Sequence, residues 1–200
     1  MLVGFIGAPI SGKTTIAAKM FTALKEQGNP AELIVEEARH YIARLRYTQN
    51  LAPTDKVVLT DDDQLRIAGA QKEIEEVMKH GCGFDTIIVS DSSIFNASLY
   101  LSNGFLDHPD RPFFKSLKGH YDLLFYCHPI PVKTLPDDPN RIHDLDAIVK
   151  IQLRSLKLFN ILRGLDIKVV ELLGSLNLEQ RYHDACSATM SHYLEVAKRA

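Results

Sequence analysis

The fold is decided by the stretch Gly7-Ala8-Pro9-Ile10-Ser11-Gly12-Lys13-Thr14-Thr15, which follows the apolar run Leu2-Val3-Gly4-Phe5-Ile6. Residues 7–14 match the pattern G-x-x-x-x-G-K-[ST] at every fixed position, and a helix-type sequence follows them. A strand, this loop and a helix in succession form a phosphate-binding P-loop. The two fixed glycines permit backbone angles and close approaches that a side chain would block. The sequence therefore predicts that a nucleoside triphosphate binds at this loop.

The chemistry of a P-loop assigns roles to these residues. Its backbone amides can point into one concavity, and the positive end of the following helix faces the same point. Lys13 is expected to reach the β- and γ-phosphates of ATP, and the Thr14 hydroxyl is expected to hold Mg²⁺. The predicted nucleotide-binding residues are Gly7, Ala8, Pro9, Ile10, Ser11, Gly12, Lys13, Thr14 and Thr15.

Length, charge and cysteine content narrow the class of protein. The chain has 200 residues, which suits one domain over residues 1–200. Its formal net charge is −2, so no overall basic field gathers nucleic acid, although a local basic patch stays open. The three cysteines form no C-x-x-C pair, and no apolar run approaches the ~20 residues needed to cross a bilayer. We therefore expect a reduced cytoplasmic protein without a membrane partner.

Strand-type and helix-type segments alternate along the chain. The pattern predicts strands over residues 2–6, 31–36, 85–90, 121–127 and 167–172, and helices over residues 13–27, 37–47, 61–80, 144–163 and 178–198. Residues 92–120 are expected to form short helices and loops. The alternation predicts an α/β fold, a P-loop NTPase of the nucleotide-kinase type with a five-stranded parallel sheet between two helical layers. Ligands are then expected outside the carboxyl ends of the strands.

Two of these helices are expected to pack through apolar side chains at helical spacing. For residues 61–80 the predicted apolar side is Ile67, Ile74, Val77 and Met78. For residues 144–163 it is Leu145, Val149, Leu156 and Phe159. The three aspartates at residues 61–63 are interpreted as a helix start rather than a metal site, because the helix dipole favours anions there.

Missing motifs exclude several classes of P-loop protein. The chain contains no Asn-Lys pair for guanine recognition and no Leu-Ser-Gly-Gly signature of transporter ATPases. Asp91 follows the third predicted strand, but Ser92 stands where motor-type and hexameric ATPases usually carry a glutamate that activates water. Transfer to a bound hydroxyl is therefore favoured over hydrolysis.

Acidic side chains at strand ends are the candidates for metal binding and proton transfer. Asp91 is expected either to bind Mg²⁺ through water or to accept the proton of the attacking hydroxyl. Glu36 and Glu37 end the neighbouring strand, and only one of them points into the crevice if the strand alternates to its end. We favour Glu37. The next helix also carries three arginines, which we interpret as a solvated face rather than a site for a substrate anion: Arg39, Arg44 and Arg46.

The segment 129–143 contains four prolines and is predicted to be a loop that acts as a lid over the phosphates. It carries Lys133, Asp137, Asp138 and Arg141. An arginine from a lid stabilises charge on the transferring phosphoryl group, whereas an exposed salt bridge in the same loop contributes little. Both interpretations of Arg141 stay open.

The order of these motifs resembles the nicotinamide-riboside-kinase-like P-loop ATPases, a family with many phage members. The P-loop, Glu37-Ala38-Arg39, Gln71, Asp91 and the lid carry the resemblance, which covers roughly residues 1–175. It implies that Lys13 and Thr14 serve ATP and Mg²⁺, that Asp91 lies at the acceptor or the metal, and that Arg141 belongs to the lid. The family often has Asp-Thr-Asp where this chain has Asp91-Ser92-Ser93, and it has spread to several acceptors.

These features predict an ATP- and Mg²⁺-dependent kinase that moves the γ-phosphate to a hydroxyl or phosphate of a nucleoside- or nucleotide-like acceptor. The expected catalytic residues are Lys13, Asp91, Glu37 and Arg141, and the expected metal-binding residues are Thr14 and Asp91. One alternative is a kinase of a hydroxymethylated pyrimidine in DNA, similar to phage 5-hydroxymethyluridine DNA kinases. Lys115, Lys118, His120 and the arginines of the second helix would then form a local DNA track. A third possibility is a nucleotide-binding ATPase or regulatory module without an acceptor.

Overall fold

Five parallel strands form one sheet in the order β2-β3-β1-β4-β5 in the computed structural model, which describes residues 1–52, 55, 57–102, 104–129, 145–165, 167–173 and 177–198. Each neighbouring pair of strands is parallel. The strands are β1 (Leu2–Ile6), β2 (Ala31–Ile34), β3 (Ile87–Ser90), β4 (Leu123–Cys127) and β5 (Val169–Leu172). The prediction of a five-stranded parallel sheet is confirmed, with four of the five strands shorter than expected at one or both ends.

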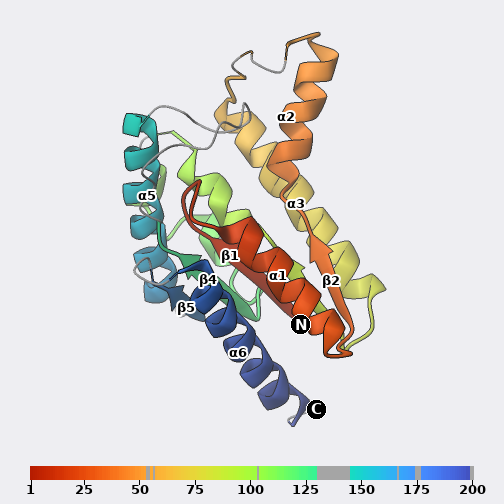
Figure 1. The fold of residues 1–200 in the computed structure, drawn as a ribbon. Helices are drawn as coiled ribbons and strands as arrows, with labels where there is room; N and C mark the ends of the chain where they lie inside the picture. The colour runs from red at the N-terminus through yellow and green to blue at the C-terminus, as the bar shows by residue number, and fades with distance from the viewer. Residues whose placement is uncertain are drawn as a thin grey trace.

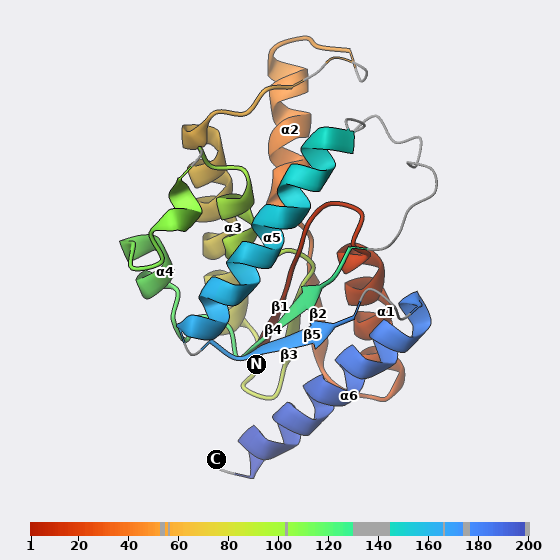
Figure 2. The ribbon, with the colours of Figure 1, turned by 90° about the vertical axis from the view of Figure 1, so that its left-hand side faces the viewer.

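Helices cover both faces of the sheet. They are α1 (Lys13–Glu26), α2 (Glu37–Thr48), α3 (Asp61–Gly81), α4 (Pro112–Ser116), α5 (Leu145–Gly164) and α6 (Leu178–Ala197), with two short 3₁₀ helices, η1 (Ile94–Leu99) and η2 (Phe105–Asp107). In Figure 2, α1 and α6 lie on one side of the strands, and α3 and α4 lie on the other. The predicted α/β fold with two helical layers is therefore confirmed. Residues 130–144, which make up almost all of the expected lid, lie outside the described residues.

The central strand β1 supplies side chains to two separate cores. Leu2 and Ile6 belong to a cluster with residues of η1, α4 and α5, whereas Val3 and Phe5 belong to a cluster with residues of α1 and α6. This division follows from the pleat of a strand, which sends successive side chains to opposite faces. All side chains of β1 are buried, as expected for the centre of a parallel sheet.

The inward faces of α3 and α5 differ from the expected ones. In α3, Val77 is 62% exposed and Ile74 is 36% exposed, and the buried residues are Gln64, Ile67, Ala68, Gln71 and Glu75. Polar contacts to the sheet, described below, set the orientation of this helix. In α5, Val149 and Leu156 are exposed, and the core side chains are Ile148, Ile151, Leu158, Phe159 and Leu162. Apolar residues cover a broad part of the surface of α5. The sequence pattern is therefore compatible with either of two neighbouring faces being the buried one.

The carboxyl ends of the strands meet at one edge of the sheet. Figure 1 shows this edge at the top, where β1 leads through the P-loop into α1 and β2 leads into α2. The two chain termini lie at the opposite end of the molecule (Figure 1). Within the part of the chain that the structure describes, no helix combines the length and apolarity needed to cross a membrane.

Candidate active site

The P-loop joins β1 to α1 through a backbone that requires glycine. Gly7 and Gly12 have φ values of 143° and 84°. A Cβ atom on Gly7 would lie 2.6 Å from the carbonyl oxygen of Cys127, which leaves no room for any other residue. Gly12 is the N-cap of α1, and no side chain caps this helix. The first amides of α1 are therefore available to a phosphate group.

Lys13 lies across the loop that precedes it. Its Nζ atom donates hydrogen bonds to the carbonyl oxygens of Gly7 at 2.9 Å and Ala8 at 2.8 Å. Burial lowers the pKa of Lys13, and the negative charges of Glu36 and Asp91 partly offset this effect. The amine thus lies across the P-loop and forms no ion pair with any residue that the structure describes, so the phosphates of a nucleotide could supply its charge partner.

A second positively charged side chain, Arg181, supports the P-loop through hydrogen bonds to backbone carbonyl groups. Arg181 on α6 is fully buried, and its Nη1 atom donates hydrogen bonds to the carbonyl oxygens of Ser11 at 3.2 Å and His128 at 2.8 Å. These bonds connect the P-loop to the end of β4. The sequence contains no local signal for this role, because Arg181 stands in an ordinary amphipathic helix 170 residues after Ser11.

Asp91 follows β3 and is 2% exposed. Neither of its carboxylate oxygens has a hydrogen-bond partner among the described residues, although both are buried. Burial raises the pKa of Asp91 to about 6, and the nearby charge of Glu36 adds to this effect. A buried carboxylate without partners is unfavourable by itself, and it becomes favourable when a cation binds.

The donor set at this point suits Mg²⁺. Mg²⁺ binds oxygen ligands, keeps several waters and commonly takes one or two carboxylates beside substrate phosphates. Thr14 offers a hydroxyl within the P-loop, close enough to Asp91 to lower the pKa of that carboxyl, and Asp91 offers two buried oxygen atoms. The two predicted metal-binding residues therefore fit the ion that their positions in the sequence imply.

Of the two glutamates after β2, Glu36 lines the crevice beside Asp91. Its carboxylate accepts a hydrogen bond from the Ser92 hydroxyl at 3.2 Å. Glu37 is 4% exposed, and its carboxylate pairs with Arg44 and with His40, the latter at 3.3 Å. Glu36 is the N-cap of α2, whereas Glu37 is its first residue and pairs with residues further along the same helix. Our preference for Glu37 as the crevice residue is therefore replaced by Glu36.

Arg39 also belongs to the site, contrary to our interpretation of it as part of a solvated face. Its Nη2 atom donates a hydrogen bond to the Thr14 hydroxyl at 3.1 Å, and its Nε atom lies 3.4 Å from the Glu36 carboxylate. Arg44 and Arg46 bind elsewhere, to Glu37 and to the Asp55 carbonyl. The sequence contains one indication that Arg39 belongs to the site. Arg39 stands one helical turn after Glu36, which follows β2.

A crevice between α2, α3 and η1 opens beside Asp91. Its polar lining consists of Glu36, Gln64, Gln71, Ser92, Ser93, Asn96 and Tyr100. Burial raises the pKa of Tyr100, and the charge of Glu36 adds to this effect, so the phenol stays protonated. The crevice lies where the carboxyl ends of β2, β3 and β1 meet, which is the expected position of a ligand in this fold.

Asn96 connects this crevice to the P-loop. Its Oδ1 atom accepts a hydrogen bond from the Gly7 amide at 3.2 Å. Its Nδ2 atom donates to the Phe5 carbonyl and to the Ser92 hydroxyl, both at 2.9 Å. The amide of Asn96 is thus fully used, and it sets the position at which the phosphate-binding loop begins.

Behind the crevice, the fully buried carboxylate of Glu75 on α3 holds four groups together. It accepts hydrogen bonds from Ser90 at 2.7 Å, Tyr121 at 3.0 Å and Gln71 at 3.1 Å, and it pairs with His120 at 2.7 Å. Gln71 in turn accepts a hydrogen bond from the Glu37 amide at 3.0 Å. The network fixes the wall that carries Glu36 and Asp91, and it explains why α3 buries polar residues.

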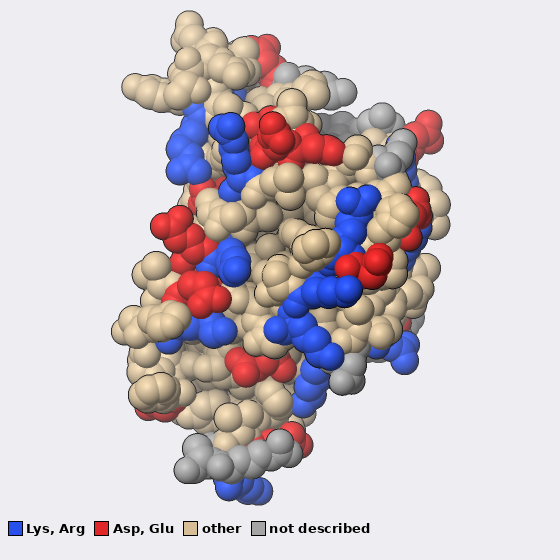
Figure 3. Space-filling view, turned by 180° about the vertical axis from the view of Figure 1, so that it is seen from behind, with Lys and Arg blue, Asp and Glu red and all other residues tan. Residues whose placement is uncertain are grey.

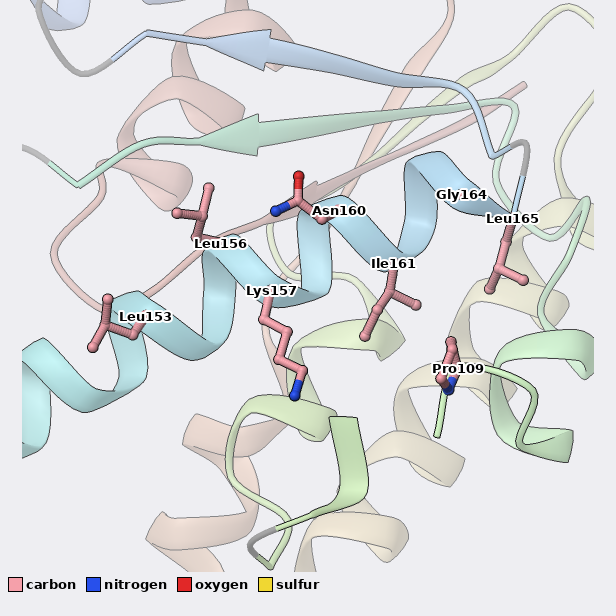
Figure 4. Close-up of a pocket in the computed structure, with 8 residues that line it drawn as sticks. All are labelled: Pro109, Leu153, Leu156, Lys157, Asn160, Ile161, Gly164 and Leu165. Atoms are coloured by element: carbon pink, nitrogen blue, oxygen red, sulfur yellow. The ribbon is translucent and has the colours of Figure 1, made fainter. Parts of the chain in front are cut away.

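A larger groove lies elsewhere, on α5. It has a volume of about 560 Å³ and apolar walls that include Leu153, Leu156, Ile161 and Leu165 (Figure 4). Its one charged lining residue, Lys157, pairs with Asp107. This groove includes no P-loop residue and no carboxylate, so the crevice beside Asp91 is the better candidate for an active site. Lys133, Asp137, Asp138 and Arg141 of the expected lid lie outside the described residues.

Solved structures with the same fold include two P-loop kinases. A NadR protein in complex with NAD and AMP-PNP matches with a TM-score of 0.61 and 19% identity, over 96% of this chain and 49% of that chain. A NadR protein in complex with NR matches with a TM-score of 0.64 and 19% identity, over 96% and 51%. Thymidylate kinase from Ehrlichia chaffeensis matches with a TM-score of 0.63 and 14% identity, over 94% and 98%. The chain thus spans about half the length of the NadR chains.

Comparison of the sequence with protein families gives one assignment over nearly the whole chain. Residues 2–181 match the family described as an AAA domain, AAA_28. None of the curated protein sequences compared with the chain matches it. The matched range includes the P-loop, Asp91 and Arg181, and the resemblance to P-loop kinases inferred from the sequence is confirmed. The chain belongs to this AAA-domain family, and its fold is that of the P-loop kinases.

Proposed function

We propose that the chain is an ATP- and Mg²⁺-dependent kinase that transfers the γ-phosphate to a hydroxyl or phosphate of a nucleoside- or nucleotide-like acceptor. One juxtaposition carries the proposal: a P-loop lysine, a buried carboxylate without a partner among the described residues, and a polar crevice meet at one sheet edge. The solved structures with this fold support it, because the NadR protein binds NAD, AMP-PNP and NR, and the third structure is a thymidylate kinase.

Each residue of the site has its own role in the proposed phosphoryl transfer. The P-loop amides and Lys13 bind the β- and γ-phosphates, and Thr14 with Asp91 would hold Mg²⁺, which neutralises phosphate charge when it is bound. Glu36 orients the acceptor hydroxyl in the crevice. The acceptor oxygen forms a bond to the γ-phosphorus, the bond between this phosphorus and the leaving ADP oxygen breaks, and Glu36 takes the hydroxyl proton. Arg39 faces the developing charge from the other side, and Arg141 of the lid is proposed to act with it.

A DNA-linked acceptor is the second candidate. Figure 3 shows Lys and Arg side chains in a diagonal band on one face of the molecule, with acidic residues beside it, and such a band can follow a phosphate backbone. His120 cannot contribute to a DNA track, because it is buried between Glu75 and Glu76. Lys115 and Lys118 are exposed and stay available.

Transfer of labelled γ-phosphate from ATP tests these alternatives. The acceptors are nicotinamide riboside, nucleosides, nucleoside monophosphates, and DNA with or without hydroxymethylated pyrimidines. We expect label on a free nucleoside or nucleotide and no label with Lys13→Ala. Lys19→Ala is the matched control, because Lys19 lies on the same helix and pairs with Glu179. Label on DNA alone would establish the second candidate, and release of free phosphate without any labelled acceptor would leave an ATPase.

A further inference from the structure

Three side chains with a carboxamide line the crevice, and two of them are fully engaged inside the protein. Gln71 accepts from the Glu37 amide and donates to Glu75 and Ser90. Asn96 accepts from the Gly7 amide and donates to the Phe5 carbonyl and the Ser92 hydroxyl. These two amides hold the walls of the crevice, and both N–H groups of each are already used, so neither can donate to a ligand.

Gln64 differs from both. It is 6% exposed and lines the crevice, yet its amide forms no hydrogen bond with any described residue. The apolar side chains of Ile67 and Ile94 also line the crevice. The amide atoms themselves keep some exposure, so a ligand in the crevice can reach them and use both the oxygen and the NH₂ group. Ligand sites commonly have this form, with a few placed polar groups on an apolar wall.

We propose that Gln64 determines which acceptor binds, and that the acceptor carries a planar ring with a hydrogen-bond donor next to a hydrogen-bond acceptor on one edge. A carboxamide presents one oxygen and one NH₂ group side by side, so it pairs with such an edge through two parallel hydrogen bonds. Carboxamide-bearing rings and nucleobases have this edge, whereas a bare sugar or polyol does not. The inference rests on the proposed function, in which the crevice receives the phosphoryl acceptor.

The two walls of the crevice differ in how firmly they are held. The crevice has a volume of about 30 Å³, roughly that of one water molecule, so a ring enters only if a wall moves. Gln64 lies on α3, which Glu75 and Gln71 fix to the sheet. The opposite wall is α2, in which Glu37 is the one buried residue. The amide of Gln64 is therefore on the wall that the buried network holds, and α2, although joined to this wall by the bond from the Glu37 amide to Gln71, is the less buried wall.

Paired ligands and paired variants test this inference. The transfer rate and calorimetric binding are measured for thymidine and N3-methylthymidine, and for nicotinamide riboside and nicotinic acid riboside, since the second member of each pair lacks the ring-edge donor. The wild-type protein is expected to prefer the first member of at least one pair by about ten- to hundredfold. Gln64→Met is expected to abolish this preference while the KM for ATP stays unchanged. Gln71→Met is the contrast, because it removes three internal hydrogen bonds and is expected to lower the Tm, which Gln64→Met is not.

The outcomes separate the inference from the proposed function. Transfer with a preference that survives in Gln64→Met overturns the role of Gln64 and leaves the kinase in place. Binding that depends on Gln64 without any transfer supports the role of Gln64 and overturns the kinase reaction. Neither transfer nor binding with any member of the panel overturns both.

Discussion

The guanidinium of Arg39 lies 3.1 Å from the hydroxyl oxygen of Thr14, although 25 residues separate them in the sequence. Thr14 is also the P-loop residue expected to hold Mg²⁺. A positive group thus lies beside the hydroxyl that is expected to hold the metal, and its Nε atom is 3.4 Å from the Glu36 carboxylate.

Arg39→Ala is expected to lower kcat by about ten- to hundredfold, because an arginine facing the transferring phosphoryl group stabilises the transition state more than the bound nucleotide. The change in affinity for ATP, measured by equilibrium titration, is expected to be smaller than the change in kcat. Arg46→Ala is the control on the same helix, since Arg46 binds the Asp55 carbonyl away from the site. Equal kcat values for the two variants would contradict the placement of Arg39 at the reacting groups.

Asp91→Asn is expected to stabilise the protein at neutral pH while it abolishes Mg²⁺-dependent transfer. The pKa of Asp91 is about 6 in the folded chain against 3.8 as its ordinary value, so the folded state binds more protons between these pH values. Stability therefore falls as pH rises through this window, and above it the charged carboxylate destabilises the fold by about 1–3 kcal/mol. Asparagine removes that penalty.

Denaturant titrations at two pH values check this expectation. Asp91→Asn should exceed the wild type in free energy of unfolding at about pH 7.5, and the gap should close at about pH 3.5, where Asp91 is protonated in both states. In the wild-type enzyme, activity should fall as pH drops through about 6, because the ionised carboxylate is needed for the metal. A stability gap that is the same at both pH values would show that the charge of Asp91 is not its origin.

Glu36→Gln and Glu37→Gln are expected to act on different properties. Loss of a general base lowers kcat by about 10²–10⁴-fold, and we expect this for Glu36→Gln with little change in Tm. Glu37→Gln breaks an ion pair between the buried Glu37 carboxylate and the exposed Arg44, so we expect a lower Tm and a much smaller change in kcat. Steady-state kinetics and thermal melting of both variants test this expectation. A larger loss of kcat in Glu37→Gln than in Glu36→Gln would restore Glu37 as the base.

Glu75→Leu is expected to destabilise the fold by about 3–5 kcal/mol, because it leaves His120, Ser90, Tyr121 and Gln71 buried without their common partner. The free energy of unfolding measured in urea checks this value. Glu73→Leu is the control, since Glu73 is exposed on the same helix and should change stability by less than about 0.5 kcal/mol. Similar losses in both variants would point to a general effect of removing charge from α3.

Motifs with fixed local spacing were predictable from the sequence. The P-loop carries its geometry in Gly7 and Gly12, and an apolar strand before it and a helix after it set its position in the sheet. The three inner strands β1, β3 and β4 were equally predictable, because parallel strands buried on both faces are continuous apolar runs. Asp91 was found for the same reason, since it ends one of these runs.

Side chains that act over long sequence separations were not predictable. In the sequence, Glu75 has the pattern of one more charge on an amphipathic helix. The apolar pattern placed Ile67 and Met78 correctly on the inward side of α3, and it was wrong for Ile74 and Val77. Arg181 and Arg39 also have the sequence pattern of surface residues. Only the packing of α6 and α2 against the sheet edge brings them to the P-loop. The choice between Glu36 and Glu37 depended on where β2 stops, and element boundaries are the least certain part of a sequence pattern.

The three hydrogen bonds of Asn96 have a consequence for how relatives of this protein can diverge. A substitution there would alter the acceptor crevice and the first peptide of the P-loop together, so any new acceptor preference would come with a weaker grip on the nucleotide. Gln64 lines the same crevice but has no hydrogen bond to the P-loop among the described residues, so its substitution is expected to change ATP binding little. Within one small crevice, a substitution of Asn96 is thus expected to affect nucleotide binding and acceptor binding together. A substitution of Gln64 is expected to affect acceptor binding alone.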